Sequence, residues 1–83
     1  MPDKTRVILY TKESCGLCDK MKQEMRSADV EELYTLEEVD IEKDPDLFAR
    51  YRYEIPVLII NGVEAFRHRL TAEQFRAYVN SLL

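Results

Sequence analysis

Apolar and polar residues alternate along this chain with two different periods, which predict strands that alternate with helices. Residues 6–11 are almost continuously apolar, as in a strand that is covered on both faces of a sheet. From Leu17 onward apolar side chains recur every three or four residues, as they do on the buried face of a helix. These side chains are Leu17, Cys18, Met21, Met25 and Ala28. Ser14 is expected to cap this helix.

Two further elements are predicted in the middle of the chain. Residues 36–41 carry more charge than the first strand, which favours a strand at an edge of the sheet. Asp44 and Pro45 then mark a helix start, because aspartate caps the free N–H groups of a first turn and proline needs no partner there. The buried face of this second helix is predicted to comprise Leu47, Phe48 and Tyr51.

The last third of the chain predicts a hairpin and a final helix. Residues 55–60 form another apolar run. Asn61-Gly62 is a strong signal for a tight turn back into a strand over residues 63–66. Thr71 and Gln74 fit a capping box at a helix start. The apolar stripe of the final helix is predicted to comprise Phe75, Tyr78, Val79 and Leu82.

The predicted order is therefore β-α-β-α-β-β-α, which is an α/β fold in one domain over residues 1–83. The first β-α-β unit requires a right-handed crossover, so its two strands are parallel. The hairpin makes the last two strands antiparallel. A mixed four-stranded sheet with helices on both faces is the expected result.

Composition restricts the possible partners. The formal net charge is −4, so we expect neither nucleic acid nor an anionic membrane as a partner. No apolar run approaches the ~18 residues that would span a bilayer, and the first five residues lack the apolar region of a signal peptide. We therefore expect a cytoplasmic protein. As a separate expectation, we take the chain to act as a monomer.

The candidate chemistry lies in Cys15 and Cys18, the only two cysteines of the chain. Structural disulfides are rare in the cytosol. A Cys-x-x-Cys pair beside a β-α-β pattern is instead typical of reversible thiol–disulfide exchange. A structural zinc site normally needs four ligands, and only His68 would add an imidazole. We therefore expect no metal and no tightly bound cofactor.

The order of residues around this pair predicts their roles. A helix N-terminus favours a thiolate, so Cys15 is expected to attack a substrate disulfide. Cys18 lies about one turn into the helix and is expected to be more buried and to resolve the mixed disulfide. Gly16 lets the turn bend without a side-chain clash, and Leu17 offers an apolar surface to the substrate. Lys12, just before the pair, adds a positive charge.

These residues resemble the glutaredoxin family over nearly the whole chain, and in particular its short members with a Cys-x-Leu-Cys site. The resemblance lies in residues 7–12, Cys15-Gly16-Leu17-Cys18, Val39-Asp40-Ile41, Asp44-Pro45, Ile55-Pro56-Val57 and Asn61-Gly62. It implies a thioredoxin-like fold in which a cis Ile55–Pro56 bond lies against the cysteines and faces the substrate. It also implies that Lys12 holds a glutathione carboxylate, with glutathione as reductant or co-substrate.

Three segments depart from the pattern of dithiol glutaredoxins. Gly16-Leu17 stands where those proteins have Pro-Tyr, and Glu54-Ile55-Pro56 stands where they have Thr-Val-Pro. Phe66-Arg67-His68-Arg69 replaces a Gly-Gly pair and the acidic residue after it, which helps to hold the amino group of glutathione. Of the glutathione site that the resemblance implies, Lys12 is therefore retained and this last part is altered.

Together these features predict a thiol–disulfide oxidoreductase with a dithiol mechanism. Its expected partners are a disulfide-containing protein or a glutathione mixed disulfide, with glutathione or a reductase as electron donor. Two alternatives stay open. One is a thioredoxin-type electron carrier that does not use glutathione. The other is a non-enzymatic module that binds an iron–sulfur cluster, or that binds a partner through the basic segment Arg67-His68-Arg69.

Overall fold

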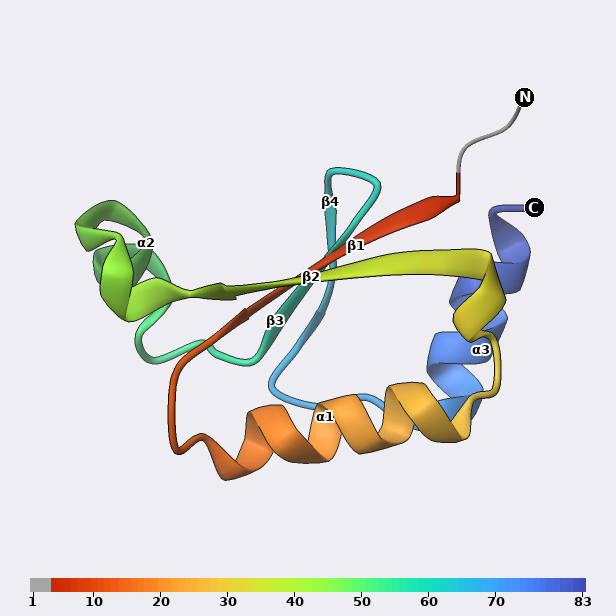
Figure 1. Cartoon of the computed structure of the whole chain (residues 1–83), viewed down its shortest axis with the longest axis horizontal. Helices are drawn as coiled ribbons and strands as arrows, with labels where there is room; N and C mark the ends of the chain where they lie inside the picture. The colour runs from red at the N-terminus through yellow and green to blue at the C-terminus, as the bar shows by residue number, and fades with distance from the viewer. Residues whose placement is uncertain (1–3) are drawn as a thin grey trace.

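A mixed sheet with three helices packed against it makes up residues 4–83, the part of the chain that this computed structural model describes (Figure 1). The strands are β1 (Thr5–Thr11), β2 (Tyr34–Asp40), β3 (Val57–Ile60) and β4 (Val63–Arg67). The helices are α1 (Gly16–Ser27), α2 (Pro45–Tyr51) and α3 (Ala72–Ser81), with short 3-10 turns at Glu31–Leu33 and Ile41–Lys43. This is the predicted order of elements. Within residues 4–83, no helix has the length and apolar character that crossing a membrane requires.

The strand order in the sheet is β2-β1-β3-β4. β1 and β2 are parallel, as predicted for the first β-α-β unit. β3 is antiparallel to both β1 and β4, and Leu58 lies between Leu9 on one side and Phe66 on the other. β2 lies at an edge of the sheet, as its charged sequence predicts.

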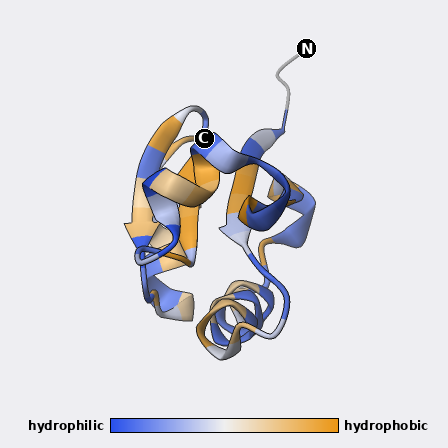
Figure 2. Cartoon of the chain, turned by 90° about the vertical axis from the view of Figure 1, so that its left-hand side faces the viewer, coloured by the Kyte–Doolittle hydropathy of each residue, from blue (hydrophilic) through white to orange (hydrophobic). Residues whose placement is uncertain are grey.

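The main core lies between the sheet and the two helices α1 and α3. It contains Val7, Leu9, Met21, Met25, Leu58, Ile60, Phe75 and Val79, all at most 1% exposed. Figure 2 shows the hydrophobic residues gathered on the strands at the centre of the molecule. Leu82 is 42% exposed because α3 ends at Ser81, so its predicted place in the buried stripe is wrong.

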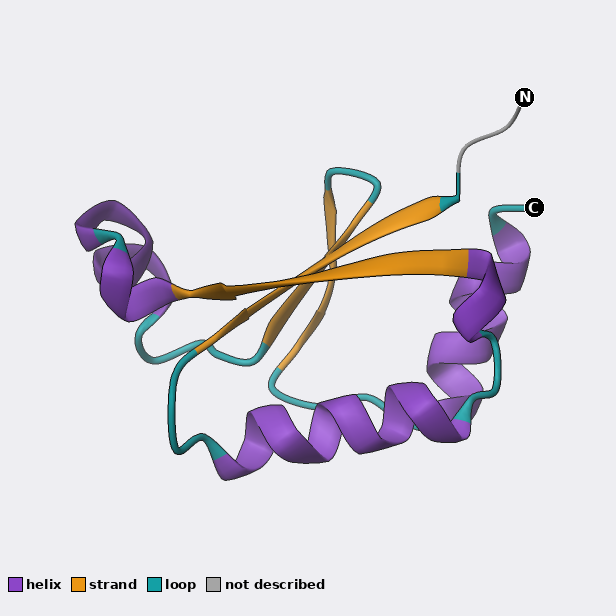
Figure 3. Ribbon diagram, in the orientation of Figure 1, coloured by secondary structure: helices purple, strands orange, loops and turns teal. Residues whose placement is uncertain are grey.

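The two faces of the sheet are covered unequally. Val7 and Leu9 of β1 are buried on the face of α1 and α3, whereas Tyr10 packs on α2, where its ring stacks on that of Tyr51 with centroids 4.9 Å apart. Figure 3 shows α1 and α3 along one side of the sheet and α2 at one end. α2 has only seven residues, and Ile8 is left half-buried. Helices therefore lie on both faces, but the second face is covered at one end only.

Side-chain caps fix the starts of two helices. Asp44 Oδ1 accepts hydrogen bonds from the N–H groups of Asp46 and Leu47, at 3.0 and 3.2 Å. Thr71 and Gln74 exchange the two hydrogen bonds of a capping box, at 3.1 and 3.0 Å. Both predicted helix starts are confirmed, because each depends on a short local motif.

The hairpin between β3 and β4 turns at Asn61 and Gly62, as predicted. Their φ angles are +49° and +83°, and two successive positive values are typical of a type I′ turn. Asn61 also exchanges two hydrogen bonds with the backbone of Arg6: its Oδ1 accepts at 2.9 Å and its N–H donates at 2.8 Å. The turn is therefore fixed to the start of β1.

Replacing Thr71 with alanine removes the acceptor for the Gln74 N–H at the start of α3. We expect the free energy of unfolding to fall by about 1 kcal/mol, as measured by urea unfolding. Asn80→Ala, an exposed change in the last turn of the same helix, is the control and should change this free energy by less than about 0.5 kcal/mol. Equal effects of the two substitutions would contradict the role given to the capping box.

Candidate active site

Cys15 and Cys18 are joined in a disulfide at the first turn of α1. Cys15 is the N-cap residue and Cys18 is the third residue of the helix, and their Cα atoms are 5.2 Å apart. Cys15 is 8% exposed and Cys18 is 1% exposed. The order of accessibility is the predicted one, with the N-terminal cysteine the more accessible of the pair.

The backbone of the first turn of α1 is directed at Cys15. The Cys18 N–H donates a hydrogen bond to Cys15 Sγ at 3.1 Å, and the Asp19 N–H donates to the Cys15 carbonyl at 3.1 Å. Ser14 is not the cap, contrary to the prediction: its φ of +55° reverses the chain just before the helix. Because N–H groups at a helix start favour negative charge, this turn favours a thiolate at Cys15 in the reduced protein.

The disulfide lies in a small cluster of buried side chains, separate from the main core. The buried members are Cys15, Cys18, Ile41 and Ile55, and the half-buried side chains packed on them are Tyr10, Leu47, Phe48 and Tyr51. The Ile55–Pro56 bond is cis, and Pro56 is fully buried just before β3. The fold thus brings Ile55, which is distant in the sequence, into one cluster with both cysteines.

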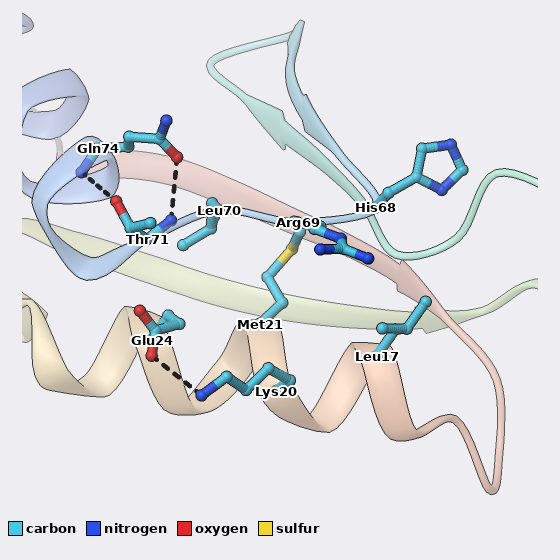
Figure 4. A pocket seen from close by; sticks show the side chains of 9 residues that line it. All are labelled: Leu17, Lys20, Met21, Glu24, His68, Arg69, Leu70, Thr71 and Gln74. Carbon is cyan, nitrogen blue, oxygen red and sulfur yellow. Dashed lines mark hydrogen bonds and ion pairs between the residues drawn. The ribbon is translucent and has the colours of Figure 1, made fainter.

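Two hollows adjoin the segment that carries the disulfide. The larger one, which we call the α1 groove, has a volume of about 640 Å³ and lies between α1 and the connection from β4 to α3 (Figure 4). Leu17, which stands between the two cysteines, is part of its wall and is 50% exposed. Gly16 is exposed, and a Cβ there would meet no atom within 4 Å. The glycine is therefore not needed to avoid a clash, contrary to the prediction.

Lys12 lies in the second hollow, which has a volume of about 320 Å³. Four carboxylates share this hollow, those of Glu13, Asp19, Glu38 and Asp40. Lys22 is the other cation, and it pairs with Glu38 at 3.0 Å and with Asp19 at 3.7 Å. Acidic groups outnumber basic ones around Lys12, so these surroundings do not favour an anionic ligand.

An ion-pair network that the sequence did not predict joins the segment before β3 to the end of β4. Arg67 donates to Glu54 at 2.7 Å and to Glu64 at 2.8 Å, and His68 Nε2 lies 3.4 Å from Glu54. The His68 N–H also donates to the Pro56 carbonyl at 2.7 Å. Together these contacts hold Glu54 and Pro56, which flank Ile55, against the end of β4.

Arg67 and Glu64 of this network shift each other's pKa. The hydrogen bond from Arg67 holds the pKa of Glu64 below its ordinary value of 4.5, and the same bond raises the pKa of the Arg67 guanidinium. Both groups are exposed, so salt screens the interaction.

Among residues 4–83, no three His, Cys, Asp or Glu side chains are grouped as a metal ion would require.

Comparisons with known proteins agree with this geometry. Residues 6–80 match the family model of a glutaredoxin-like domain (DUF836). The chain is 26% identical over 80 residues to the glutaredoxin-like protein YDR286C homolog of Dictyostelium discoideum, covering 89% of this chain and 74% of that protein.

Solved structures with a similar fold include two bacterial proteins, each 24% identical to this chain. Protein XcR50 from X. campestris has a TM-score of 0.78, with 90% of this chain and 96% of that chain covered. Protein Ne2328 from Nitrosomonas europaea has a TM-score of 0.76, with 94% of each chain covered. Chloroplastic thioredoxin z has a TM-score of 0.72 at 21% identity, with 96% of this chain and 79% of that chain covered. The similarity establishes a thioredoxin fold.

The Glu64–Arg67 pair should make part of the stability depend on pH. Because the pKa of Glu64 is lowered in the folded protein, its contribution is present above its ordinary value and is lost as the pH falls through the lowered value. We expect Glu64→Gln to lower the urea midpoint near neutral pH, and we expect this effect to shrink as the pH falls through the lowered pKa of Glu64 and the carboxyl takes up its proton. Glu37→Gln, exposed on β2, is the control. A Glu64→Gln effect that stays constant over this fall in pH would refute the pair's contribution.

Proposed function

The chain belongs to the family of glutaredoxin-like domains (DUF836), and on this basis we propose that it is a thiol–disulfide oxidoreductase. The observation that carries the proposal is the disulfide between its only two cysteines at the start of α1, with Cys15 the more accessible. A redox-active pair needs one sulfur that a substrate can reach and a second sulfur held next to it. The greater exposure of Cys15 and the adjacent position of Cys18 support this assignment.

The proposed reaction begins with the Cys15 thiolate, which attacks one sulfur of a substrate disulfide. A Cys15–substrate disulfide forms, and the other substrate sulfur leaves as a thiolate that takes up a proton. Cys18 then loses its proton and attacks the Cys15 sulfur, which releases the second substrate thiol. Two electrons and two protons pass to the substrate, the Cys15–Cys18 disulfide is formed, and a thiol reductant restores the dithiol.

Ile55 and Pro56 are proposed to contact the substrate during this exchange. Ile55 packs in the same cluster as both cysteines, which supports this role. Its N–H already donates to the Tyr51 carbonyl at 3.1 Å. A substrate backbone that pairs with this segment would therefore use the Ile55 carbonyl as its acceptor.

Single-cysteine variants test the two proposed roles. We expect Cys15→Ser to reduce a protein disulfide no faster than the reductant alone, because the attacking sulfur is missing. Cys18→Ser should form a mixed disulfide with the substrate that persists, because no second thiol displaces it. Mass spectrometry of the variants after mixing with a disulfide substrate distinguishes these species. Turnover by Cys15→Ser at the wild-type rate would exclude the mechanism.

A second candidate differs in its electron donor: a thioredoxin-type carrier that a reductase reduces without glutathione. The acidic surroundings of Lys12 favour this candidate. So does the bulky, basic sequence of residues 66–69, where the glutathione-using pattern has small and acidic residues. A cluster-binding or purely partner-binding module stays a prediction, and colourless protein after anaerobic reconstitution with iron and sulfide would dismiss the cluster.

The rates of reduction of the oxidised protein by the two donors should therefore differ. We expect a thioredoxin reductase to support turnover, and glutathione with glutathione reductase to support at least about tenfold less. The physical reason is that four carboxylates around Lys12 oppose a bound anion. NADPH consumption with a common disulfide substrate measures both rates. Faster turnover with glutathione would remove this candidate and restore glutathione as the donor.

A further inference from the structure

We propose that the α1 groove binds the segment of a substrate protein that flanks its disulfide, and that it selects segments in which a large apolar side chain lies next to a carboxylate. This inference rests on the proposed oxidoreductase function and adds a substrate class to it.

The groove begins at Leu17, in the first turn of α1 that carries the cysteine pair, and continues along the helix. Leu17 lies between the two cysteines, and Glu24 lies two turns further along the helix, roughly 10 Å along its axis. Glu24 Oε1 accepts a hydrogen bond from the Ala72 N–H at 3.0 Å and ties α1 to the start of α3 at this far end. A chain that occupies the groove therefore has its reactive end at Leu17.

Apolar side chains form part of the groove wall, and Leu17 stands at the end that carries the cysteine pair. Leu17 is 50% exposed, while Met21 and Leu70 are buried with their surfaces at the groove (Figure 4). An apolar side chain of the bound segment would cover Leu17. Glutathione has no such side chain, so this part of the groove fits a protein segment better than glutathione.

Arg69 supplies a positive charge that no carboxylate among the described residues 4–83 neutralises. The other two basic side chains of the groove are already paired: Lys20 with Glu24 at 3.5 Å, and His68 with Glu54 at 3.4 Å. Among residues 4–83, no carboxylate lies within 4.0 Å of the Arg69 guanidinium. A guanidinium beside an apolar wall is suited to bind a carboxylate with two parallel hydrogen bonds.

Arg69 follows His68, whose backbone is in a left-handed conformation that is energetically unfavourable for residues other than glycine. The φ of His68 is +70°, and the Arg69 N–H donates to the Arg67 carbonyl at 2.8 Å, which closes a three-residue turn. Such γ-turns are rare and strained outside glycine. The His68 N–H bonds to the Pro56 carbonyl at 2.7 Å, so the turn that positions Arg69 is coupled to the segment beside the disulfide.

Peptide disulfides that differ in one flanking pair of residues test this proposal. The pre-reduced protein is mixed, in single turnover, with symmetrical disulfides of short peptides whose cysteine is preceded by Leu-Glu, Leu-Lys or Gly-Glu, and the released thiols are separated by chromatography. We expect Leu-Glu to be reduced about five- to tenfold faster than either of the others at low salt. The advantage over Leu-Lys should shrink at about 0.5 M salt.

Charge reversal in the protein provides the matched comparison. Arg69→Glu should invert the ratio of Leu-Glu to Leu-Lys rates. Arg26→Glu, which makes the same change in net charge at the exposed last turn of α1, should leave the ratio unchanged. Leu17→Ser should reduce the advantage of Leu-Glu over Gly-Glu. Each ratio compares two peptides with the same variant, so any change in the reactivity of the cysteines cancels.

The outcomes separate this proposal from the proposed function. Equal rates for all three peptides, with hydroxyethyl disulfide still reduced, would overturn the groove proposal and leave the oxidoreductase intact. Reduction of a glutathione mixed disulfide faster than any peptide, and unaffected by Arg69→Glu, would also overturn it and would assign the site to glutathione. If the wild type reduces none of these disulfides, the oxidoreductase function itself is excluded.

Discussion

The short strand β3 is the element on which the rest of this fold depends. All four of its residues are apolar, and it pairs with β1 on one side and β4 on the other. The same strand begins directly after Ile55 and Pro56, so its position in the sheet also determines where these two residues meet the cysteines. The hydrogen bond from His68 to the Pro56 carbonyl extends this dependence to the connection before α3. The packing of the core and the geometry of the candidate site therefore both depend on the position of β3 in the sheet.

The candidate site lies at the start of α1, the helix that contributes residues to both buried clusters. α1 contributes Met21 and Met25 to the main core and Cys18 to the smaller cluster, so the helix that carries the cysteine pair is held over its whole length. The surface beside the pair differs on its two sides. Acidic groups predominate around Lys12, whereas the guanidinium of Arg69 adds a positive charge to the α1 groove. A rigid pair between surfaces of different charge favours one direction of approach for a charged substrate.

Much of the fold could be predicted from the sequence, because its boundaries are marked by local motifs. Asp44-Pro45, Asn61-Gly62 and the capping box of Thr71 and Gln74 each act over a few residues, and the structure confirms all three. The pattern of the cysteine pair likewise predicted its place at the start of a helix. The left-handed backbone of Ser14 was missed, because serine at a helix start is more often the cap itself.

The parts of the site that could not be predicted depend on contacts between distant segments. Glu54 and Arg67 meet only because β3 and β4 fold back on each other, and nothing in the spacing of these two residues marks the pair. The wall of the α1 groove is likewise assembled from α1 and the connection before α3. The basic segment around His68 could be identified in the sequence. Which of its side chains form ion pairs depends on the fold, which brings Glu54 and Glu64 to Arg67 and Glu54 to His68.

The sulfur at the N-cap of α1 links electron transfer to the stability of that helix. In the oxidised protein, Cys15 Sγ accepts the Cys18 N–H as a neutral disulfide sulfur. In the reduced protein a thiolate at the same position would accept it as an anion and interact more strongly with the helix start. An interaction that stabilises the first turn of α1 more in the thiolate form than in the disulfide form favours the reduced protein. Such an interaction therefore raises the reduction potential of the Cys15–Cys18 pair. Substitutions along α1 that do not contact the sulfur would therefore change how readily the Cys15–Cys18 disulfide accepts electrons.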